Sequence, residues 1–345
     1  MSSSQYILKN AERIAVVRTD RLGDMVLTLP MCAALKATCP NSEIILIARS
    51  YCESLLYKSP AIDRALFTDR TIGGVSELIR SGNYEAIFFP RAQFGEYFAA
   101  FKARIPLRIG SGYRWYSFLI NHKQYDHRKT AEFHEAEYNT RLVGSVLEQP
   151  VETRLVCPVI TPESKESVEN ILASHGISSE QKLIIIHPGS GGSSHDWSPE
   201  NFGKLATQLT KQRDIPIILT GIESENNLCN RVQNQCPTLF NLCGKLTLAE
   251  MISLLDVSSL LVANSTGVLH IAAALETPLV GLYPRSSALS AKRWGPYSQN
   301  SIVLSPPNVH NQQDDMSLIT VESVVDACLS LLSINLTDEH TTFSP

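Results

Sequence analysis

The 345-residue sequence predicts an α/β protein with two Rossmann-like, doubly wound parallel-sheet domains that face a cleft. Short apolar runs alternate with segments of helical periodicity along most of the chain, which is typical of parallel sheets. The alternation weakens between residues 148 and 181, where three prolines punctuate the sequence. Because one hydrophobic core rarely serves more than about 250–300 residues, we expect an N-terminal domain over 1–158 and a C-terminal domain over 159–345.

In the first domain, apolar runs predict strands at residues 13–17, 44–48 and 86–89. The apolar segment from Met25 to Lys36 follows a polar turn and predicts a largely buried helix. Residues 94–125 are rich in aromatic and basic side chains, and their pattern assigns neither helices nor strands.

The second domain repeats the alternation of strands and helices. We expect strands at residues 183–186, 215–219, 260–263 and 279–283. Thr247 and Glu250 form a capping box at the start of one expected helix. Thr266 opens another helix directly after the third strand. A terminal helix over 321–332 is free to pack back on the N-terminal domain.

Composition and charge argue against several classes of function. The net charge of −4 argues against a general nucleic-acid binder, because such proteins carry a basic excess. The chain has no run of 18 apolar residues, and its first residues lack the apolar stretch of a signal peptide. We therefore expect a cytoplasmic protein with no nucleic-acid partner.

The helix start Thr266-Gly267-Val268-Leu269-His270 is the first candidate binding site. The N-terminus of a helix carries unpaired N–H groups and a partial positive charge, so it attracts anions. Gly267 would let a phosphate approach the backbone, and the Thr266 hydroxyl can cap the helix. A plain helix cap with a tight turn explains the same residues equally well.

The loop 187–197 is the second candidate. It holds three glycines and three serines between a strand and a helix, which suits a phosphate cradle. It lacks the GKS or GKT of a Walker loop, and a surface loop without function remains the alternative.

Asp24, at the end of the first strand–helix loop, is the third candidate. Its carboxylate could take a proton from an acceptor hydroxyl. The competing interpretation is that Asp24 caps the next helix. The chain contains no DxD motif, so we expect no metal-bound diphosphate and no cofactor.

Together these segments resemble glycosyltransferase family 9, the ADP-heptose:lipopolysaccharide heptosyltransferase family. Three blocks carry the resemblance: Arg18 to Pro30, His187 to Phe202, and Gly244 to Leu248 followed by Asn264 to Leu275. Their order and spacing agree from residue 13 to about residue 300. The resemblance implies a GT-B fold and a metal-independent reaction that inverts the anomeric centre.

The resemblance also implies roles for the matching residues. Asp24 is expected to be the general base, and Arg21 is expected to bind the acceptor. The expected donor-binding residues are Ser190, Gly191, His195, Glu223, Leu246, Ser265, Thr266, Gly267 and His270. Among these, Glu223 would hold the ribose hydroxyls and Leu246 would pack on the base. His195 and Ser265 stand where many family members have lysine and aspartate.

The resulting hypothesis is a cytoplasmic glycosyltransferase that moves heptose or a related sugar from a nucleotide donor to lipopolysaccharide or another cell-surface glycan. The aromatic and basic residues from 104 to 116 could bring it to a lipid-linked acceptor at the inner face of the cytoplasmic membrane, or could form an ordinary domain rim. Two other functions remain open: a nucleotide-sugar 2-epimerase on the same fold, and a sugar-nucleotide-binding protein without catalysis.

Overall fold

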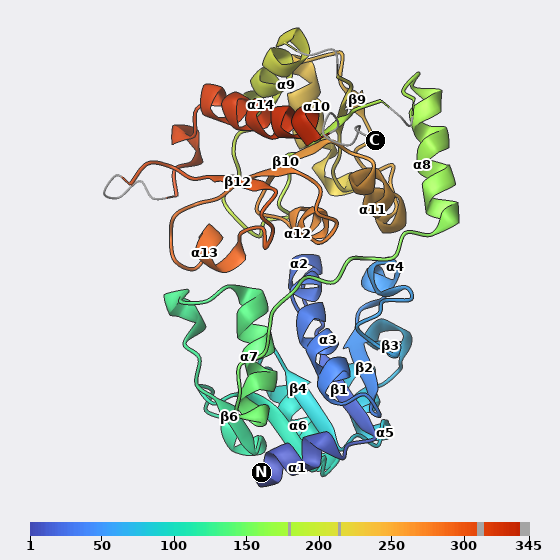
Figure 1. Cartoon of the computed structure of the whole chain (residues 1–345), viewed down its shortest axis with the longest axis vertical. Helices are drawn as coiled ribbons and strands as arrows, with labels where there is room; N and C mark the ends of the chain where they lie inside the picture. The colour runs from blue at the N-terminus through green and yellow to red at the C-terminus, as the bar shows by residue number, and fades with distance from the viewer. Residues whose placement is uncertain (179–180, 213–214, 309–313, 339–345) are drawn as a thin grey trace, which may run out of the picture. The chain divides into compact units, whose positions relative to one another are not determined.

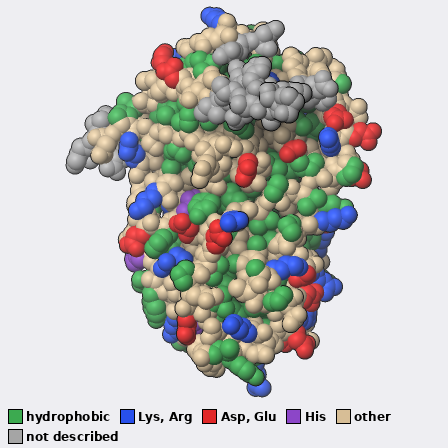
Figure 2. Space-filling view, in the orientation of Figure 1, with side chains coloured by type: hydrophobic (Ala, Val, Ile, Leu, Met, Phe, Trp, Pro, Cys, Tyr) green, Lys and Arg blue, Asp and Glu red, His purple; other side chains and the backbone are tan. Residues whose placement is uncertain are grey.

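A computed structural model of the chain describes residues 1–178, 181–212, 215–308 and 314–338 (Figure 1). The chain divides into two compact units, Met1–Val159 and Ile160–Pro345. Within the described residues, we find no helix that combines the length and the apolar character needed to cross a bilayer. On the face drawn in Figure 2, acidic and basic side chains are interspersed.

The N-terminal unit is built on a sheet of six parallel strands in the order β3-β2-β1-β4-β5-β6. The strands are β1 (Arg13–Val17), β2 (Glu43–Ala48), β3 (Arg64–Phe67), β4 (Ala86–Phe89), β5 (Leu107–Ser111) and β6 (His122–Gln124). The strand order reverses between β1 and β4, and in such sheets ligands bind beyond the carboxyl ends of the strands at this switch point.

Helices cover both faces of this sheet. They are α1 (Ser3–Lys9), α2 (Leu22–Val26), α3 (Leu29–Thr38), α4 (Glu53–Leu56), α5 (Gly74–Ser81), α6 (Phe94–Lys102) and α7 (Glu135–Leu147). Helices α1 and α3 pack against α7, and α5 packs against α6 behind the sheet in Figure 1. The core behind the sheet joins alternate strand residues such as Ala15, Ile45 and Phe89 to Tyr97 and Ala100 of α6.

The single helix predicted from Met25 to Lys36 is wrong. The chain forms α2 and then α3, with a break at Leu27 and Thr28. The cause is Pro30 in the first turn of α3, since proline lacks the N–H that would continue the preceding helix.

The C-terminal unit repeats the same strand order, β12-β11-β10-β7-β8-β9, again with every pair parallel. Its strands are β7 (Ile184–His187), β8 (Ile217–Leu219), β9 (Phe240–Asn241), β10 (Leu260–Asn264), β11 (Leu279–Leu282) and β12 (Ser301–Leu304). Here the order reverses between β7 and β10. The predicted fold class, two doubly wound parallel sheets, is therefore confirmed.

The helices of this unit are α8 (Pro162–Ser174), α9 (Pro199–Gln212), α10 (Asn226–Gln235), α11 (Leu248–Asp256), α12 (Gly267–Ala274), α13 (Ala291–Trp294) and α14 (Val321–Asp338). The predicted capping box of Thr247 and Glu250 forms at the start of α11. The terminal helix, α14, packs beside α9 in the C-terminal unit (Figure 1). The reason is its apolar face, where Val324, Cys328 and Leu332 enter the core of this unit.

Candidate functional site

In the N-terminal unit, a buried arginine and several carboxylates gather where β1 and β4 end. Arg18 follows β1 directly, and its side chain is only 3% exposed. Its Nε atom donates to Oδ1 of Asp20 at 2.6 Å, and Nη2 donates to Oδ1 of Asp24. Oε1 of Glu135, in the first turn of α7, lies 3.8 Å from Nη1. This cluster occupies the switch point at which the fold places ligands.

The cluster shifts the pKa of the Asp24 carboxyl. Burial raises the pKa of its carboxyl to about 6; Arg18 opposes this shift, while Asp20 and Glu135 add to it. Burial alone would lower the pKa of Arg18, but these three carboxylates raise it, so the guanidinium stays charged. A base titrating near the working pH can accept a proton efficiently while remaining ionised at neutrality.

A further carboxylate, Glu96, lies beside this cluster on α6. It is 4% exposed, and burial raises its pKa to about 7. The Thr19 hydroxyl donates to its Oε1 at 3.4 Å, and the Gln93 amide donates to the same oxygen at 3.2 Å. Two carboxyl groups that titrate near neutrality therefore lie at the ends of β1 and β4, and perturbed groups of this kind concentrate at functional sites.

The structure places Asp24 in the first turn of α2 rather than in the loop before it. The interpretation of Asp24 as a helix cap is wrong: Arg21 occupies the N-cap position of α2, and the Asp24 carboxylate bonds to Arg18. Arg21, the predicted acceptor-binding residue, is exposed beside it. The structure thus brings both predicted residues to the same helix start.

In the C-terminal unit, Asn264 joins the loops at the β7–β10 switch point. Its side chain is fully buried at the end of β10. Its Oδ1 accepts the backbone N–H of Trp197 at 3.0 Å, and its Nδ2 donates to the carbonyl of Pro188 at 2.6 Å. Asn264 therefore holds both ends of the loop 187–197 against the start of the Ser265–Gly267 turn.

We expect Asn264→Ala to lower the free energy of unfolding by about 2–4 kcal/mol, because it leaves two buried backbone groups unpaired. Urea unfolding followed by circular dichroism measures this change. Asn300→Ala is the matched control, since the Asn300 amide makes one exposed bond, to the carbonyl of Glu276. Equal losses in the two variants would contradict the role assigned to Asn264.

The loop 187–197 is further held by hydroxyl and carboxylate contacts. Ser193 Oγ donates to the carbonyl of Ser265 at 3.0 Å, while Ser190 is buried. The N–H of Gly191 donates to Oε1 of Glu225 at 3.2 Å, and the other oxygen of Glu225 accepts the N–H of Ile222 at 2.9 Å. If Gly191 binds a donor phosphate as predicted, its N–H must exchange this carboxylate for the phosphate.

The turn at the end of β10 leads directly into α12. Gly267 is the first residue of α12, and Thr266 is its N-cap. The expected capping bond from the Thr266 hydroxyl is not formed. The first-turn N–H groups are therefore not capped by Thr266, which suits an anion-binding helix start. Ser265 is half-buried at this turn, and His270 is buried one helical turn further on.

The remaining predicted donor residues are His195, in the loop 187–197, and Glu223 and Leu246, which follow β8 and β9. His195 is exposed near the end of the loop 187–197. Glu223 is exposed after β8, and Leu246 is half-buried after β9. Gly244 lets these two segments approach: a Cβ there would lie 3.1 Å from Cα of Glu223, and its φ of +70° disfavours other residues.

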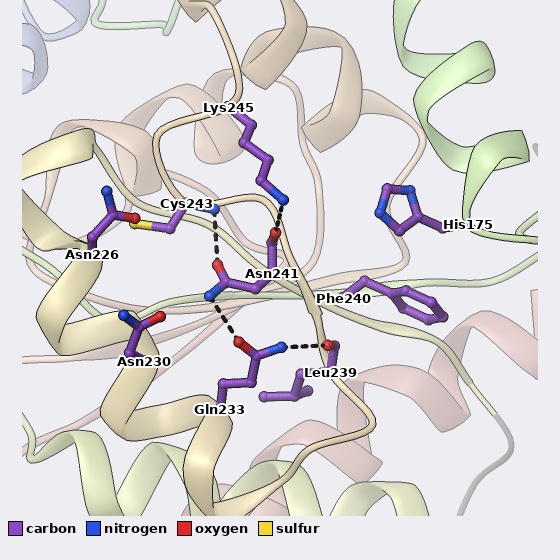
Figure 3. A pocket seen from close by; sticks show the side chains of 9 residues that line it. All are labelled: His175, Asn226, Asn230, Gln233, Leu239, Phe240, Asn241, Cys243 and Lys245. Atoms are coloured by element: carbon purple, nitrogen blue, oxygen red, sulfur yellow. Dashed lines mark hydrogen bonds between the residues drawn. The ribbon is translucent and has the colours of Figure 1, made fainter.

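A pocket of about 470 Å³ opens beside Gly244 (Figure 3). Its lining consists of His175, Asn226, Asn230, Gln233, Leu239, Phe240, Asn241, Cys243 and Lys245. The Lys245 ammonium donates to the carbonyl of Asn241 at 3.0 Å, and the Asn241 amide donates to Oε1 of Gln233 at 3.1 Å. The lining is thus rich in side-chain amides, which can bind the edge of a base or a hydroxyl group.

Sequence reasoning missed five residues that organise these sites: Arg18, Glu96, Glu135, Asn264 and Glu225. Arg18 and Asn264 each follow a predicted strand by one position, and polar residues there are the signal that could have identified them. Glu225 and the N-terminal carboxylates Glu96 and Glu135 carry no such signal, because only the fold brings them to their partners.

Comparison with known proteins places this geometry in a family. The profile of glycosyltransferase family 9 (heptosyltransferase) matches residues 79–319. A Haemophilus influenzae protein provisionally named a glycosyltransferase is 29% identical over 94% of this chain and 98% of its own. Lipopolysaccharide heptosyltransferase 2 of Salmonella typhimurium is 25% identical over 80% of this chain and 83% of its own.

The fold agrees with this assignment. The crystal structure of a family 9 glycosyl transferase from Veillonella parvula superposes with a TM-score of 0.85 at 21% identity, over 96% of this chain and 100% of that one. The family match extends over well more than half of the chain. The protein is therefore a glycosyltransferase and belongs to glycosyltransferase family 9.

Proposed function

We propose that the enzyme transfers heptose or a related sugar from a nucleoside diphosphate donor to a hydroxyl group of lipopolysaccharide or another cell-surface glycan. The observation that carries this proposal is the buried Asp24 carboxylate, paired with Arg18 at a switch point and titrating near 6. In the proposed reaction, Asp24 takes the proton of the acceptor hydroxyl while that oxygen attacks the anomeric carbon. Arg21 helps to hold the acceptor.

The C-terminal unit would bind the donor. The start of α12 at Thr266 and Gly267, together with Ser190 and Gly191, would stabilise the charge that grows on the departing diphosphate. Glu223 would accept hydrogen bonds from the ribose hydroxyls, and Leu246 would pack on the base. The pocket beside Gly244 supports this placement, because its amides offer hydrogen bonds near the proposed base.

The proposed substrates follow from the relatives. The Salmonella protein is named a lipopolysaccharide heptosyltransferase, which supports a heptose donor and a lipopolysaccharide acceptor. His195 and Ser265, which replace the lysine and aspartate of many members, and buried His270 would tune the choice of donor. A lipid-anchored acceptor would be met at the inner face of the cytoplasmic membrane, so we place the enzyme in the cytoplasm.

We expect transfer to continue in excess EDTA and the product to have the opposite anomeric configuration to the donor. The physical reason is that, in the proposed reaction, a helix start and hydroxyl groups stabilise the negative charge on the diphosphate, so that no metal is needed. Product NMR after reaction with and without EDTA measures both properties. Loss of transfer that returns with added Mg²⁺, or retained configuration, would contradict the proposal.

A further inference from the structure

Helix α6 exposes aromatic rings where an ordinary surface helix carries polar side chains. Its inner face buries Glu96, Tyr97 and Ala100. Its outer face carries Phe94 and Phe98, which are 47% and 42% exposed, and one turn further Phe101, which is 45% exposed. These residues recur at the spacing of one helical face. Both faces of α6 therefore carry aromatic side chains, although only one of them faces the sheet.

The exposed rings continue onto the segment that follows β5. Trp115 and Phe118 are 76% and 65% exposed. The ring of Phe94 stacks on that of Phe98 at 5.8 Å and on that of Trp115 at 5.5 Å. The short helix that carries Phe118 packs against α6. We call Phe94, Phe98, Phe101, Trp115 and Phe118 the aromatic surface; contiguous apolar surfaces of this kind mark interaction sites.

The charges of the segment that carries the aromatic surface are almost entirely positive. Residues 91–125 contain six lysines and arginines but a single acidic residue, Glu96, which is buried. The Lys102 ammonium lies over the ring of Phe98 at 5.5 Å, and the Arg108 guanidinium lies over that of Phe101 at 5.8 Å. This differs from the chain as a whole, whose net charge is −4, and from the interspersed charges in Figure 2.

Exposed aromatic rings flanked by lysine and arginine are typical of surfaces that enter the interface of an anionic bilayer. A second copy of the chain fits less well, because a two-fold contact would bring the same positive charges together. We infer that the aromatic surface docks on an anionic lipid bilayer, with its rings among the headgroups and Lys102 and Arg114 against their phosphates.

This docking goes beyond the proposed transfer reaction, but it would place the candidate active site close to lipid. Gln93 and Glu96 at the start of α6 reach the cluster near Asp24, because Thr19 donates to the Glu96 carboxylate. The same short helix therefore carries the docking face on one side and part of the site on the other. An enzyme whose acceptor is lipid-anchored would gain access to it in this way.

The test is flotation of the full-length protein with vesicles of phosphatidylcholine, with and without about 30% phosphatidylglycerol. We expect binding to the anionic vesicles that weakens as salt is raised from about 0.05 M to about 0.5 M. Phe98→Ser with Trp115→Ser should weaken this binding by about tenfold or more, since two rings leave the interface. Lys102→Gln with Arg114→Gln should reduce it toward the level seen with phosphatidylcholine alone.

Matched controls separate docking from general effects. Ile72 and Tyr57 are also exposed apolar residues of this unit, but they do not belong to the aromatic surface. Ile72→Ser with Tyr57→Ser should therefore leave vesicle binding unchanged. Transfer to a water-soluble acceptor should persist in Phe98→Ser with Trp115→Ser, which distinguishes a failure of docking from a failure of catalysis. Absence of binding to anionic vesicles would overturn the inference. Self-association that these two substitutions abolish would instead identify a protein interface.

Discussion

Asp24→Asn should lower kcat by about a hundredfold or more, because general-base catalysis typically contributes about 10²–10⁴ in rate. The amide keeps the shape of the carboxylate but cannot accept the proton of the acceptor hydroxyl. Asp20 and Glu135 remain beside Arg18, so the guanidinium keeps its charge partners and the fold should persist. Steady-state kinetics, with calorimetry of donor binding, should show lost turnover at nearly unchanged donor affinity.

The same carboxylate predicts the acid side of the pH profile. Burial raises the pKa of Asp24 to about 6, and the protonated form is inactive as a base. The value of kcat/KM should therefore be constant above that pH and fall about tenfold for each unit below it. In Asp24→Asn, the residual activity should lack this dependence.

Asp20→Asn is the matched control for both measurements. It makes the same chemical change four residues away in the same cluster, so kcat should stay close to that of the wild type. The Asp20 charge helps to raise the pKa of Asp24, so its removal should move the fall in activity to lower pH. Normal turnover in Asp24→Asn would remove this residue from the mechanism and leave its cluster a structural feature.

The strands that sequence reasoning identified all lie in the interior of a sheet, and β5 is the one interior strand that it missed. Strands such as β1 and β10 are buried on both faces and therefore read as continuous apolar runs. The four edge strands, β3, β6, β9 and β12, were all missed. Each is at most four residues long and partly exposed, so its apolar residues are too few to stand out in the sequence. Local pattern therefore predicted the middle of each sheet but not its edges.

The residues of the candidate site also differ in how far the sequence could predict them. Asp24 and Gly267 could be proposed as site residues because each lies in the segment between a strand and the next helix or at the start of that helix, where the fold directs function. The environment that gives Asp24 its properties could not, since Glu135 lies more than a hundred residues away in the sequence. Helix α6 was unassigned, so neither Glu96 nor the aromatic surface could be placed on faces of a helix. The site residues that were missed therefore depend on contacts between distant parts of the sequence, or lie in a segment whose pattern assigned no helix or strand.

Gly267→Asp should reduce the affinity for a nucleoside diphosphate by about a hundredfold or more. Gly267 is the first residue of α12, and the proposed diphosphate lies against that helix start. Two like charges about 4 Å apart repel by about 4 kcal/mol at the effective dielectric of a protein surface. An acidic residue is favourable in the first turn of a helix, so α12 should stay folded. Isothermal titration calorimetry with ADP, GDP, UDP and dTDP measures the loss for each base.

Gly267→Asn separates charge from size, since its side chain has the shape of aspartate without the negative charge. If the start of α12 is the anion site, Asn should retain most of the affinity that Asp removes, and the difference should shrink as salt screens the repulsion. Equal losses in both variants would mean that any side chain blocks the backbone approach. Unchanged affinity in Gly267→Asp would place the diphosphate elsewhere, and the loop held by Asn264 and Glu225 would then be the next site to test.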